Sequence, residues 1–300
     1  MRRQGGVALI TALLVVAVAA GAAVVLATST TLSLRRSGNL LLREQAFQVA
    51  LGGEAFAMTL LRRDAQNSRI DSLDEFWAQT LPPLPIEGGM VTGRLSDLQA
   101  HLNPNNLWRP DGGADPVAVD RLRNLLRALE LDPAPADAVL DWIDADNTSA
   151  GPGGAEDDYY LNLDPPYRCA NRPLSSPSEL RLVRGITPEA ADKLLPELSV
   201  LPAGSAINVN TASDATLRAL GLDDDGVARV KAARPFESMA QFKELGLLDD
   251  DNAAGLDVRT EYFLLEAQVQ LGRTRLRLYS IIHRDANGRP RVIARSLGTL

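Results

Sequence analysis

The stretch VALITALLVVAVAAGAAVVLA, residues Val7–Ala27, decides the fold of this chain. It holds 21 residues without a charged side chain and follows Arg2 and Arg3. A helix rises about 1.5 Å per residue, so about 20 apolar residues cross the core of a bilayer. The apolar region of a secretory signal peptide is shorter, normally about 7–15 residues. Three interpretations stay open: a signal peptide, a plain membrane anchor oriented by the positive-inside rule, and the first half of a longer helix.

A helical pattern continues beyond the apolar stretch. Apolar residues recur at helix-compatible spacing, namely Leu40, Phe47, Leu51, Met58 and Leu61. No proline occurs between Val7 and Leu81, so nothing in this range forces a break. The pattern therefore predicts one long helix, apolar in its first half and amphipathic in its second. We expect Pro82, Pro83 and Pro85, with Gly88–Gly89, to end it.

Strand patterns are concentrated at the C-terminus. Alternating apolar side chains predict strands over Tyr262–Gln270, Arg275–Ile282 and Arg291–Leu297, and Asn287-Gly288 is a strong hairpin turn signal. An earlier strand is predicted over Met90–Leu95. A three-stranded antiparallel meander needs a partner for its apolar face, and the second half of the long helix can supply it.

Helix start signals fill the region between the first strand and the last three. They are Asp115-Pro116, the capping box Ser176–Glu179, Thr187-Pro188, Thr211-x-x-Asp214 and Ser238-x-x-Gln241. The fold class predicted is therefore α+β: a long N-terminal helix packed on a small antiparallel sheet, with a large inserted all-α domain. We expect the sheet domain over 28–95 and 257–300 and the inserted domain over 96–256.

Composition excludes several classes of function. The formal net charge of −7 argues against a protein that neutralises nucleic-acid phosphates over a wide surface. With Cys169 as its one cysteine, the chain can form no internal disulfide and no cysteine-based zinc or iron–sulfur site. No nucleophile elbow, P-loop, His-Glu-x-x-His or dinucleotide motif occurs. We therefore expect no enzyme and no small-molecule substrate.

An oxygen-rich loop is a candidate cation site. Asp141, Asp144 and Asp146 precede the glycine-rich turn 151–154, and Glu156, Asp157 and Asp158 follow it. These acids could converge on one hard cation, and Ca²⁺ takes about 6–8 oxygen ligands. The spacing excludes an EF-hand, because Ala155 occupies the position of the bidentate acid when Asp144 is the first ligand. The alternative, a solvated acidic loop with Asp141 only capping or facing water, stays equally open on spacing alone.

The N-terminal pattern resembles that of type IV pilins and type II secretion pseudopilins. The resemblance implies that a prepilin peptidase cuts after Gly6, so that Val7 becomes the first mature residue. Pilin-like proteins usually carry a glutamate at the fifth mature position, thought to pair with the new amino group of a neighbouring subunit; here that position is Thr11. A carboxylate inside a bilayer is costly unless it is paired. The absence of this glutamate suits a subunit at a filament tip better than one in a repeating shaft.

Two segments in the middle of the chain resemble the K family of minor type II secretion pseudopilins. They are Glu179–Ile186, a Glu-Leu-x-x-Val-x-Gly pattern, and the Asn-Val-Asn-Thr-Ala run Asn208–Ala212. The resemblance implies a structural subunit at the pseudopilus tip, packed with minor pseudopilins I and J and with other pseudopilins. It also implies calcium binding by the acidic loop, with ligands from Asp144, Asp146, Glu156 and Asp157 and from the backbone carbonyl of Tyr159. The expected location is the inner membrane of a Gram-negative bacterium, crossed once, with the C-terminal bulk in the periplasm.

Two other functions remain as alternatives. Residues from about 175 to 256 are also similar to helix-hairpin-helix and SAM-like modules, which suggests a membrane-tethered DNA receptor of the competence type. Asp223, Asp224 and Asp225 would repel a phosphate there, so we expect no nucleic-acid partner. A secreted calcium-dependent hydrolase is the third possibility, and it requires cleavage of the apolar stretch near residue 23.

Overall fold

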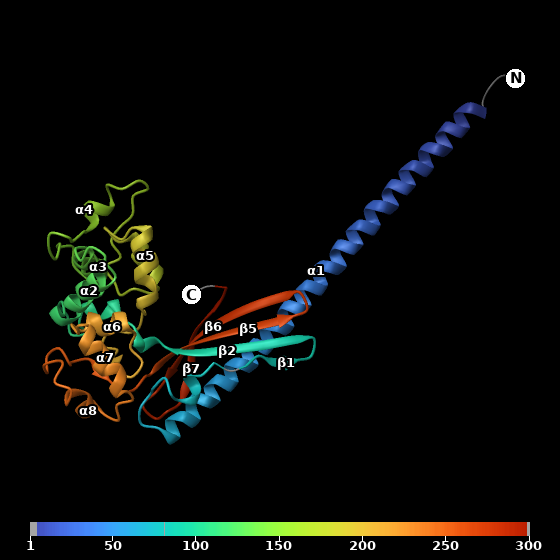
Figure 1. Cartoon of the computed structure of the whole chain (residues 1–300). Coiled ribbons are helices and arrows are strands. Elements are labelled where there is room, and N and C mark those ends of the chain that lie inside the picture. Colours follow the sequence, from blue (N-terminus) through green and yellow to red (C-terminus); the bar gives the residue numbers. More distant parts are fainter. Residues whose placement is uncertain (1–4, 81, 299–300) are drawn as a thin grey trace.

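The computed structural model describes residues 5–80 and 82–298, with side chains from residue 9 onward. One long helix leads into an antiparallel sheet, and a lobe of short helices lies beside the far end of that sheet (Figure 1). The N-terminal half of the helix projects away from both. This arrangement is the predicted fold class.

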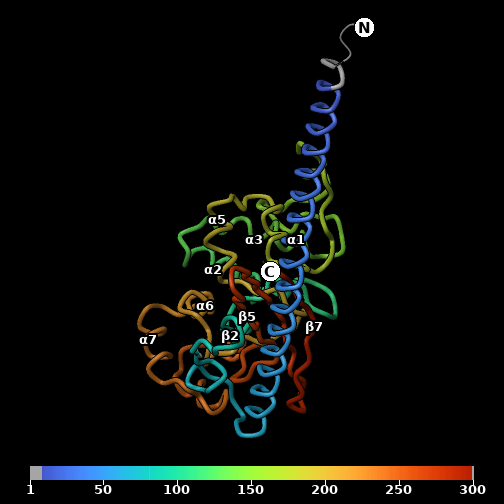
Figure 2. The backbone as a smooth tube through the Cα atoms, turned by 90° about the vertical axis from the view of Figure 1, so that its right-hand side faces the viewer, coloured from blue at the N-terminus to red at the C-terminus, as the bar shows by residue number. Residues whose placement is uncertain are grey.

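The long helix α1 (Gly5–Asn67) is continuous over 63 residues. Side chains from Leu9 to Leu41 are exposed, and burial begins at Ala46. Ala46, Ala50 and Ala57 then recur at intervals of four and seven residues, so they lie on one face of the helix. Their small side chains let α1 lie close across the sheet, as the turned view shows (Figure 2).

The prediction that the prolines at 82–85 end the long helix is wrong, because α1 stops at Asn67. The Asn67 side chain donates a hydrogen bond to the carbonyl of Arg63, and Ser68 N donates to the carbonyl of Asp64, which satisfies two of the helix's terminal carbonyls. The chain then turns so that Ile70 enters the core of the helical lobe. Tertiary packing ends the helix before any proline does.

The sheet contains five strands in the order β1-β2-β5-β6-β7, and all neighbours are antiparallel. The strands are β1 (Leu84–Ile86), β2 (Gly89–Asp97), β5 (Tyr262–Leu271), β6 (Thr274–Arg284) and β7 (Pro290–Leu297). Four of them match the predicted segments with small shifts at the ends. The fifth, β1, comes from the proline-rich stretch that was predicted to be only a boundary; as an edge strand it tolerates Pro85, which has no N–H to donate.

The sheet and the second half of α1 share one hydrophobic core. Phe263, Leu265, Ala267 and Val269 of β5 alternate toward it, as the sequence pattern predicts. Trp77 of the 3₁₀ helix η1 (Phe76–Ala78) packs edge-on against Phe263 with ring centroids 5.1 Å apart. On α1, the buried carboxylate of Glu54 accepts hydrogen bonds from Nε and Nη2 of Arg295, at 2.7 and 2.8 Å, and so joins the helix to β7.

The helical lobe lies between β2 and β5 in the sequence and has its own hydrophobic core. Its α-helices are α2 (Pro116–Ala128), α3 (Pro135–Ile143), α4 (Asp157–Tyr160), α5 (Pro188–Leu194), α6 (Asp214–Ala219), α7 (Asp224–Ala233) and α8 (Met239–Lys243). Short 3₁₀ helices connect them: η2 (Leu98–Ala100), η3 (Pro104–Leu107), η4 (Pro177–Leu182) and η5 (Leu195–Glu197). A parallel pair of two-residue strands departs from the all-α prediction: β3 (Ile207–Asn208) and β4 (Leu256–Asp257).

Most predicted helix starts are confirmed by their capping bonds. Asp115 accepts a hydrogen bond from Ala118 N at the start of α2, and Ser176 and Glu179 form the capping box of η4. Thr211 was predicted to begin the next helix, but Ser213 caps α6 instead. The Thr211 hydroxyl donates to the buried carboxylate of Asp97. A long-range partner therefore displaces the local cap.

A buried polar network joins the helical lobe to the sheet. Asp97, at the end of β2, accepts hydrogen bonds from Asn208, Thr211 and Thr260. Asn208 also donates to the carbonyl of Asp71, just beyond α1. Burial raises the pKa of Asp97 to about 6. Since the members come from distant parts of the chain, the network fixes how the two parts meet.

Candidate metal centre

The acidic loop is held between two helices of the helical lobe. Asp141 lies in the last turn of α3, and Asp144 follows three residues later as its C-cap, so both project from the same side of the helix end. The glycine-rich turn brings the chain back to Glu156, which is the N-cap of α4. Residues 15 positions apart in the sequence thus meet at one place.

Three carboxylates converge there. One oxygen from each of Asp141, Asp144 and Glu156 lies within 4.8 Å of the others. All three side chains are buried, with 0%, 4% and 3% of their surface exposed. Three like charges buried this close together repel one another strongly unless protons or a cation neutralise them.

The hydrogen bonds leave part of this cluster unpartnered. Asp141 accepts from Ala150 N at 2.8 Å and from Ala155 N at 2.7 Å, so its carboxylate also shapes the loop. In contrast, Oδ1 of Asp144 and both carboxylate oxygens of Glu156 are buried without a hydrogen-bond partner among the described residues. Buried polar atoms are nearly always satisfied in native structures, so these three oxygens fit ligands of a cation.

Electrostatics point the same way. Burial, then Asp146 and Asp141, raise the pKa of Asp144 to about 7. Burial, then Asp141 and Asp144, raise the pKa of Glu156 to about 7 as well. A bound divalent cation would reverse both effects, because it favours the ionised carboxylates.

The structure distributes the predicted ligands unequally. It brings Asp144 and Glu156 together, and the exposed Asp146 contributes charge to both. The Asp157 carboxylate turns away, since it accepts from Cys169 N at 2.9 Å and pairs with Arg168 at 3.1 Å. The carbonyl of Tyr159 accepts from Asn162 N within the turn after α4.

Asp141 is not among the ligands predicted from the sequence, although it lies in the cluster. Its spacing of three from Asp144 on a predicted helix was the available signal, because residues three apart share a helix face. Its proximity to Glu156 depends on the loop that returns the chain to the same point.

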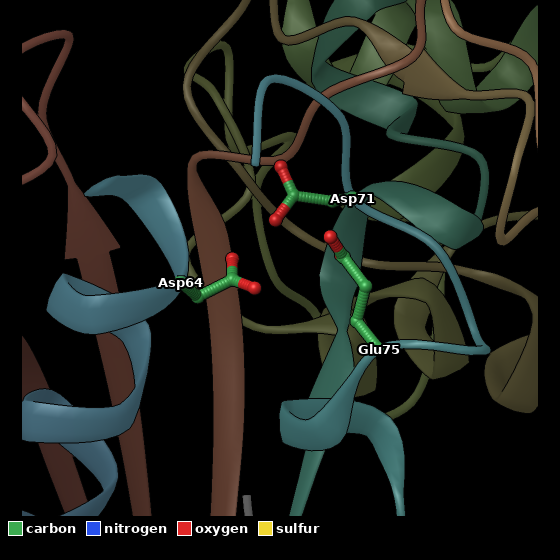
Figure 3. Close-up of side chains that lie close together, drawn as sticks. All are labelled: Asp64, Asp71 and Glu75. Carbon is green, nitrogen blue, oxygen red and sulfur yellow. The ribbon is translucent and has the colours of Figure 1, made fainter. Parts of the chain in front are cut away.

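A second acidic cluster lies where α1 ends, and Figure 3 shows Asp64, Asp71 and Glu75 pointing toward one another. This cluster already holds a cation, since Arg284 binds Asp64 at 2.9 Å and also pairs with Asp71. Glu75 accepts from Ser72 N and from the Trp77 ring nitrogen. Its charges are therefore compensated within the chain, and of the two clusters only the first lacks a cation among the described residues.

The predicted processing site lies at the start of α1. The helix begins at Gly5 and runs through Gly6, Val7 and Thr11 without interruption. The described part of this helix is long and apolar enough to cross a membrane. Between Leu9 and Leu34 it carries no acidic residue.

The segment similar to helix-hairpin-helix modules forms α6 and α7 around Gly221, whose φ of +96° suits glycine. Asp223 caps α7 by accepting a hydrogen bond from Gly226 N at 2.8 Å. A phosphate at this helix start would have to displace the Asp223 carboxylate and approach Asp225. The geometry thus opposes nucleic-acid binding.

Comparison with known proteins gives matches along nearly the whole chain. The family model described as type II secretion system (T2SS), protein K, matches residues 100–203. A type II secretion system protein K of Pseudomonas aeruginosa is 38% identical, covering 99% of this chain and 94% of its own length. The Aeromonas hydrophila protein of the same name is 34% identical, covering 96% and 95%.

A solved structure matches as well. A chain in the crystal structure of the GspK-GspI-GspJ complex from the type 2 secretion system of enterotoxigenic Escherichia coli superposes with a TM-score of 0.79 at 27% identity. The match covers 88% of this chain and 100% of that one.

Proposed function

The chain belongs to the type II secretion system protein K family and is a minor pseudopilin of that system, and we propose that it stands at the tip of the pseudopilus. The observation that carries this proposal is the combination of a filament-type helix with a bulky lobe. The first half of α1 is fully exposed and free to pack with other helices, whereas the helical lobe extends to one side of the sheet (Figure 1). A subunit of this shape can begin a fibre, and its lobe hinders the stacking of another subunit above it.

Thr11 supports the same position. The resemblance to pilins implies that a shaft subunit pairs a carboxylate at this position with the amino group of its neighbour, since a charge inside a bilayer is costly unless it is paired. The membrane half of α1 offers no such group between Leu9 and Leu34. A first subunit does not need it, so this helix is suited to starting the filament.

The partners we propose are minor pseudopilins I and J. The matching crystal structure is of a complex that contains GspI and GspJ beside GspK. Along α1, Leu9, Leu13 and Val16 are each more than 60% exposed, as expected of a helix that meets lipid or other helices. Packing of α1 with the N-terminal helices of I and J would form the start of the fibre.

The proposal includes cleavage of the leader and the orientation of α1 in the membrane. Cleavage by a prepilin peptidase after Gly6 would leave Val7 as the mature N-terminus. The single span would cross the inner membrane, with the sheet and the helical lobe in the periplasm. Mass spectrometry of the protein from membranes should then find a chain that begins at methylated Val7. An intact Met1, or a start beyond Ala20, would contradict the proposal.

Position in the fibre can be tested directly. Gold-labelled antibodies against the helical lobe should mark one end of isolated pseudopili. The full chain, solubilised in detergent, should co-purify with I and J of the same system. Label distributed along the shaft would refute the tip position.

We further propose that Asp141, Asp144 and Glu156, with Asp146 nearby, hold Ca²⁺. The three unpartnered carboxylate oxygens support this, and the ion would supply the positive charge that the cluster lacks. Magnesium fits less well because it keeps its water shell and usually meets a phosphate. Ordering a loop rich in glycine costs conformational entropy, and metal binding would offset part of that cost.

Calorimetric titration of the full chain tests the calcium site. Ca²⁺ should bind in the titration and should raise the melting temperature measured by thermal unfolding. The double variant D144N/E156Q should abolish both effects. Asp158→Asn is the matched control, because Asp158 is an exposed acid of α4, directly after the loop and outside the cluster. The variant D157N decides whether Asp157, which faces Arg168, takes part. Unchanged calcium binding in D144N/E156Q would refute the site.

A further inference from the structure

A cluster of exposed arginines lies at the end of the sheet that faces the N-terminal half of α1. The turns that join β1 to β2 and β5 to β6 lie side by side there, connected by a hydrogen bond from Gly272 N to the carbonyl of Gly88 (Figure 1). Five exposed arginines gather on this side of the molecule, and we name them the basic rim: Arg35, Arg36 and Arg43 of α1, and Arg273 and Arg275 at the β5–β6 turn. The chain as a whole carries a formal charge of −7, so the rim is of opposite sign to the rest.

Part of the rim lines an open pocket. Arg43 faces the start of β6 and the end of β7 across a cavity of about 270 Å³, which is also lined by Thr274, Arg275, Arg277 and Leu297. Arg277 is already engaged, with Glu266 at 3.4 Å and the Tyr279 hydroxyl at 3.3 Å. The five rim arginines have no ion pair among the described residues. Leu276 packs in the core under α1, so its neighbour Arg275 projects from the opposite face of the sheet, while Arg43 lies on the α1 side. The rim thus presents guanidinium groups on both faces of this end of the sheet, and such groups are suited to phosphates.

The rim continues from the pocket toward the apolar stretch. Arg36 and Arg43 are seven residues apart, so they lie on the same face of α1 about 10 Å from each other. This is the face that meets the sheet further along, where Ala50 follows at the same spacing. If α1 tilts in the bilayer toward the side of Arg36 and Arg43, the β5–β6 turn approaches the surface of the bilayer.

Acidic residues near the rim are fewer. Glu44 lies next to Arg43 on α1, and Glu87 lies in the turn before β2; both are exposed. Glu266 is paired with Arg277. The balance at this end of the sheet therefore remains positive. Leu40 on α1 and Met90 on β2, which are 65% and 45% exposed, add apolar side chains near the same end of the sheet.

We propose that the basic rim binds the phosphate headgroups of anionic phospholipids in the bilayer that α1 spans. The charged residues begin directly after the uncharged run that ends at Leu34, so the headgroups lie within reach of the first arginines. Arg35 and Arg36 are nearest to the uncharged run and meet the headgroups first, while Arg43 and Arg275 meet them at the end of the sheet. This contact keeps the sheet close to the membrane before the subunit is incorporated into the pseudopilus.

The inference rests on the proposed insertion of α1 into a bilayer. The test measures insertion of α1 and contact of the basic rim with the lipid separately. The full chain carrying Met90→Cys is labelled with an environment-sensitive fluorophore at that residue. The native Cys169 is buried with its thiol pKa raised to about 12, so it stays unlabelled. The protein is reconstituted into vesicles of phosphatidylcholine, or of equal parts phosphatidylcholine and phosphatidylglycerol. Flotation reports insertion, and quenching by headgroup spin-labelled lipid reports contact of the sheet with the surface.

Strong quenching is expected in the vesicles that contain phosphatidylglycerol and weak quenching in phosphatidylcholine alone. The contact equilibrium should weaken roughly fivefold for each arginine removed, so by roughly 25-fold in R43Q/R275Q. R62Q/R289Q is the matched control, since both arginines are exposed at the other end of the sheet, and it should leave quenching unchanged. R43K/R275K should retain most of the contact because the charge is kept.

Three results would overturn the proposal. Equal quenching in both kinds of vesicle would show that lipid charge is irrelevant. An unchanged signal in R43Q/R275Q would show that the rim is not the contact. Release by inorganic phosphate at constant ionic strength would show a site for free phosphate instead of a lipid headgroup. Failure of the chain to float would contradict the membrane premise itself.

Discussion

Replacing Arg284 by methionine would leave two buried carboxylates without their cation. Arg284 projects from the end of β6 and is only 6% exposed. It pairs with Asp64 at the end of α1 and with Asp71 beyond it, donates to the carbonyl of Thr260 at 2.9 Å, and lies over the ring of Phe263. Methionine keeps much of the apolar contact and removes the charge and the donors.

The expected loss follows from the burial of Asp71, which is 1% exposed. Removing one partner of a buried ion pair costs about 3–5 kcal/mol, because the remaining charge cannot reach water. At roughly 2–4 °C per kcal/mol for a chain of this size, the R284M variant should melt roughly 10 °C lower at pH 8.

The loss should shrink at lower pH. Burial, then Glu75, already raise the pKa of Asp64 to about 7, and burial raises that of Asp71. Without Arg284, which lowers both, the pKa values rise further above those of the unfolded chain. The folded variant then binds protons that the unfolded chain releases, so its stability falls as pH rises through that window and recovers as the acids become protonated. At pH 5 the deficit should fall to about half or less.

Thermal unfolding of the full chain in detergent, followed by circular dichroism at pH 5 and pH 8, measures both effects. Arg277→Met is the matched control, because its pair with Glu266 is about half exposed, and it should cost less than about 1 kcal/mol at either pH. An R284M variant that melts like the parent at pH 8, or whose deficit is the same at pH 5, would refute the reasoning.

Three further predictions concern single positions. Gly288→Ala should destabilise the chain by about 1–3 kcal/mol beyond the cost of its φ of +74°, because the new Cβ would lie 2.8 Å from Cβ of Ala65. The control Gly246→Ala, with a φ of +62° and open space around it, should cost only about 1–2 kcal/mol. Equal melting temperatures of the two variants would contradict this prediction. Ser213→Ala should lower the unfolding free energy by about 1 kcal/mol through loss of the α6 cap, as denaturant titration would measure. The buried Cys169 thiol, whose pKa is raised to about 12, should react with a disulfide reagent at pH 8 only at the rate of unfolding; a rate like that of a free thiol would show it to be accessible.

Local sequence signals predicted the elements whose causes are local. The uncharged run Val7–Ala27 lies in α1, alternation marked β5 to β7, and the Ser176–Glu179 capping box is present as predicted. Each depends on residues a few positions apart, where periodicity and side-chain chemistry act directly on the backbone.

Other features could not be read in this way because their partners are distant. α1 ends at Asn67, before any proline, since Ile70 belongs to another core. Thr211 gives up its capping role to bind Asp97, 114 residues away in the sequence. In the candidate site, the sequence offered the acids of the loop, but only folding selected Asp141 over Asp157 as the third buried carboxylate.

By itself, then, the sequence determined that this protein has an apolar helix of membrane length, a meander of antiparallel strands and an acidic loop, since these follow from hydrophobicity, alternation and charge along the chain. The tertiary structure decided where the helix stops, which carboxylates meet and which arginines share a rim. Those outcomes depend on burial, which is a property of the packed chain, because desolvation acts on a side chain only after distant segments have closed around it.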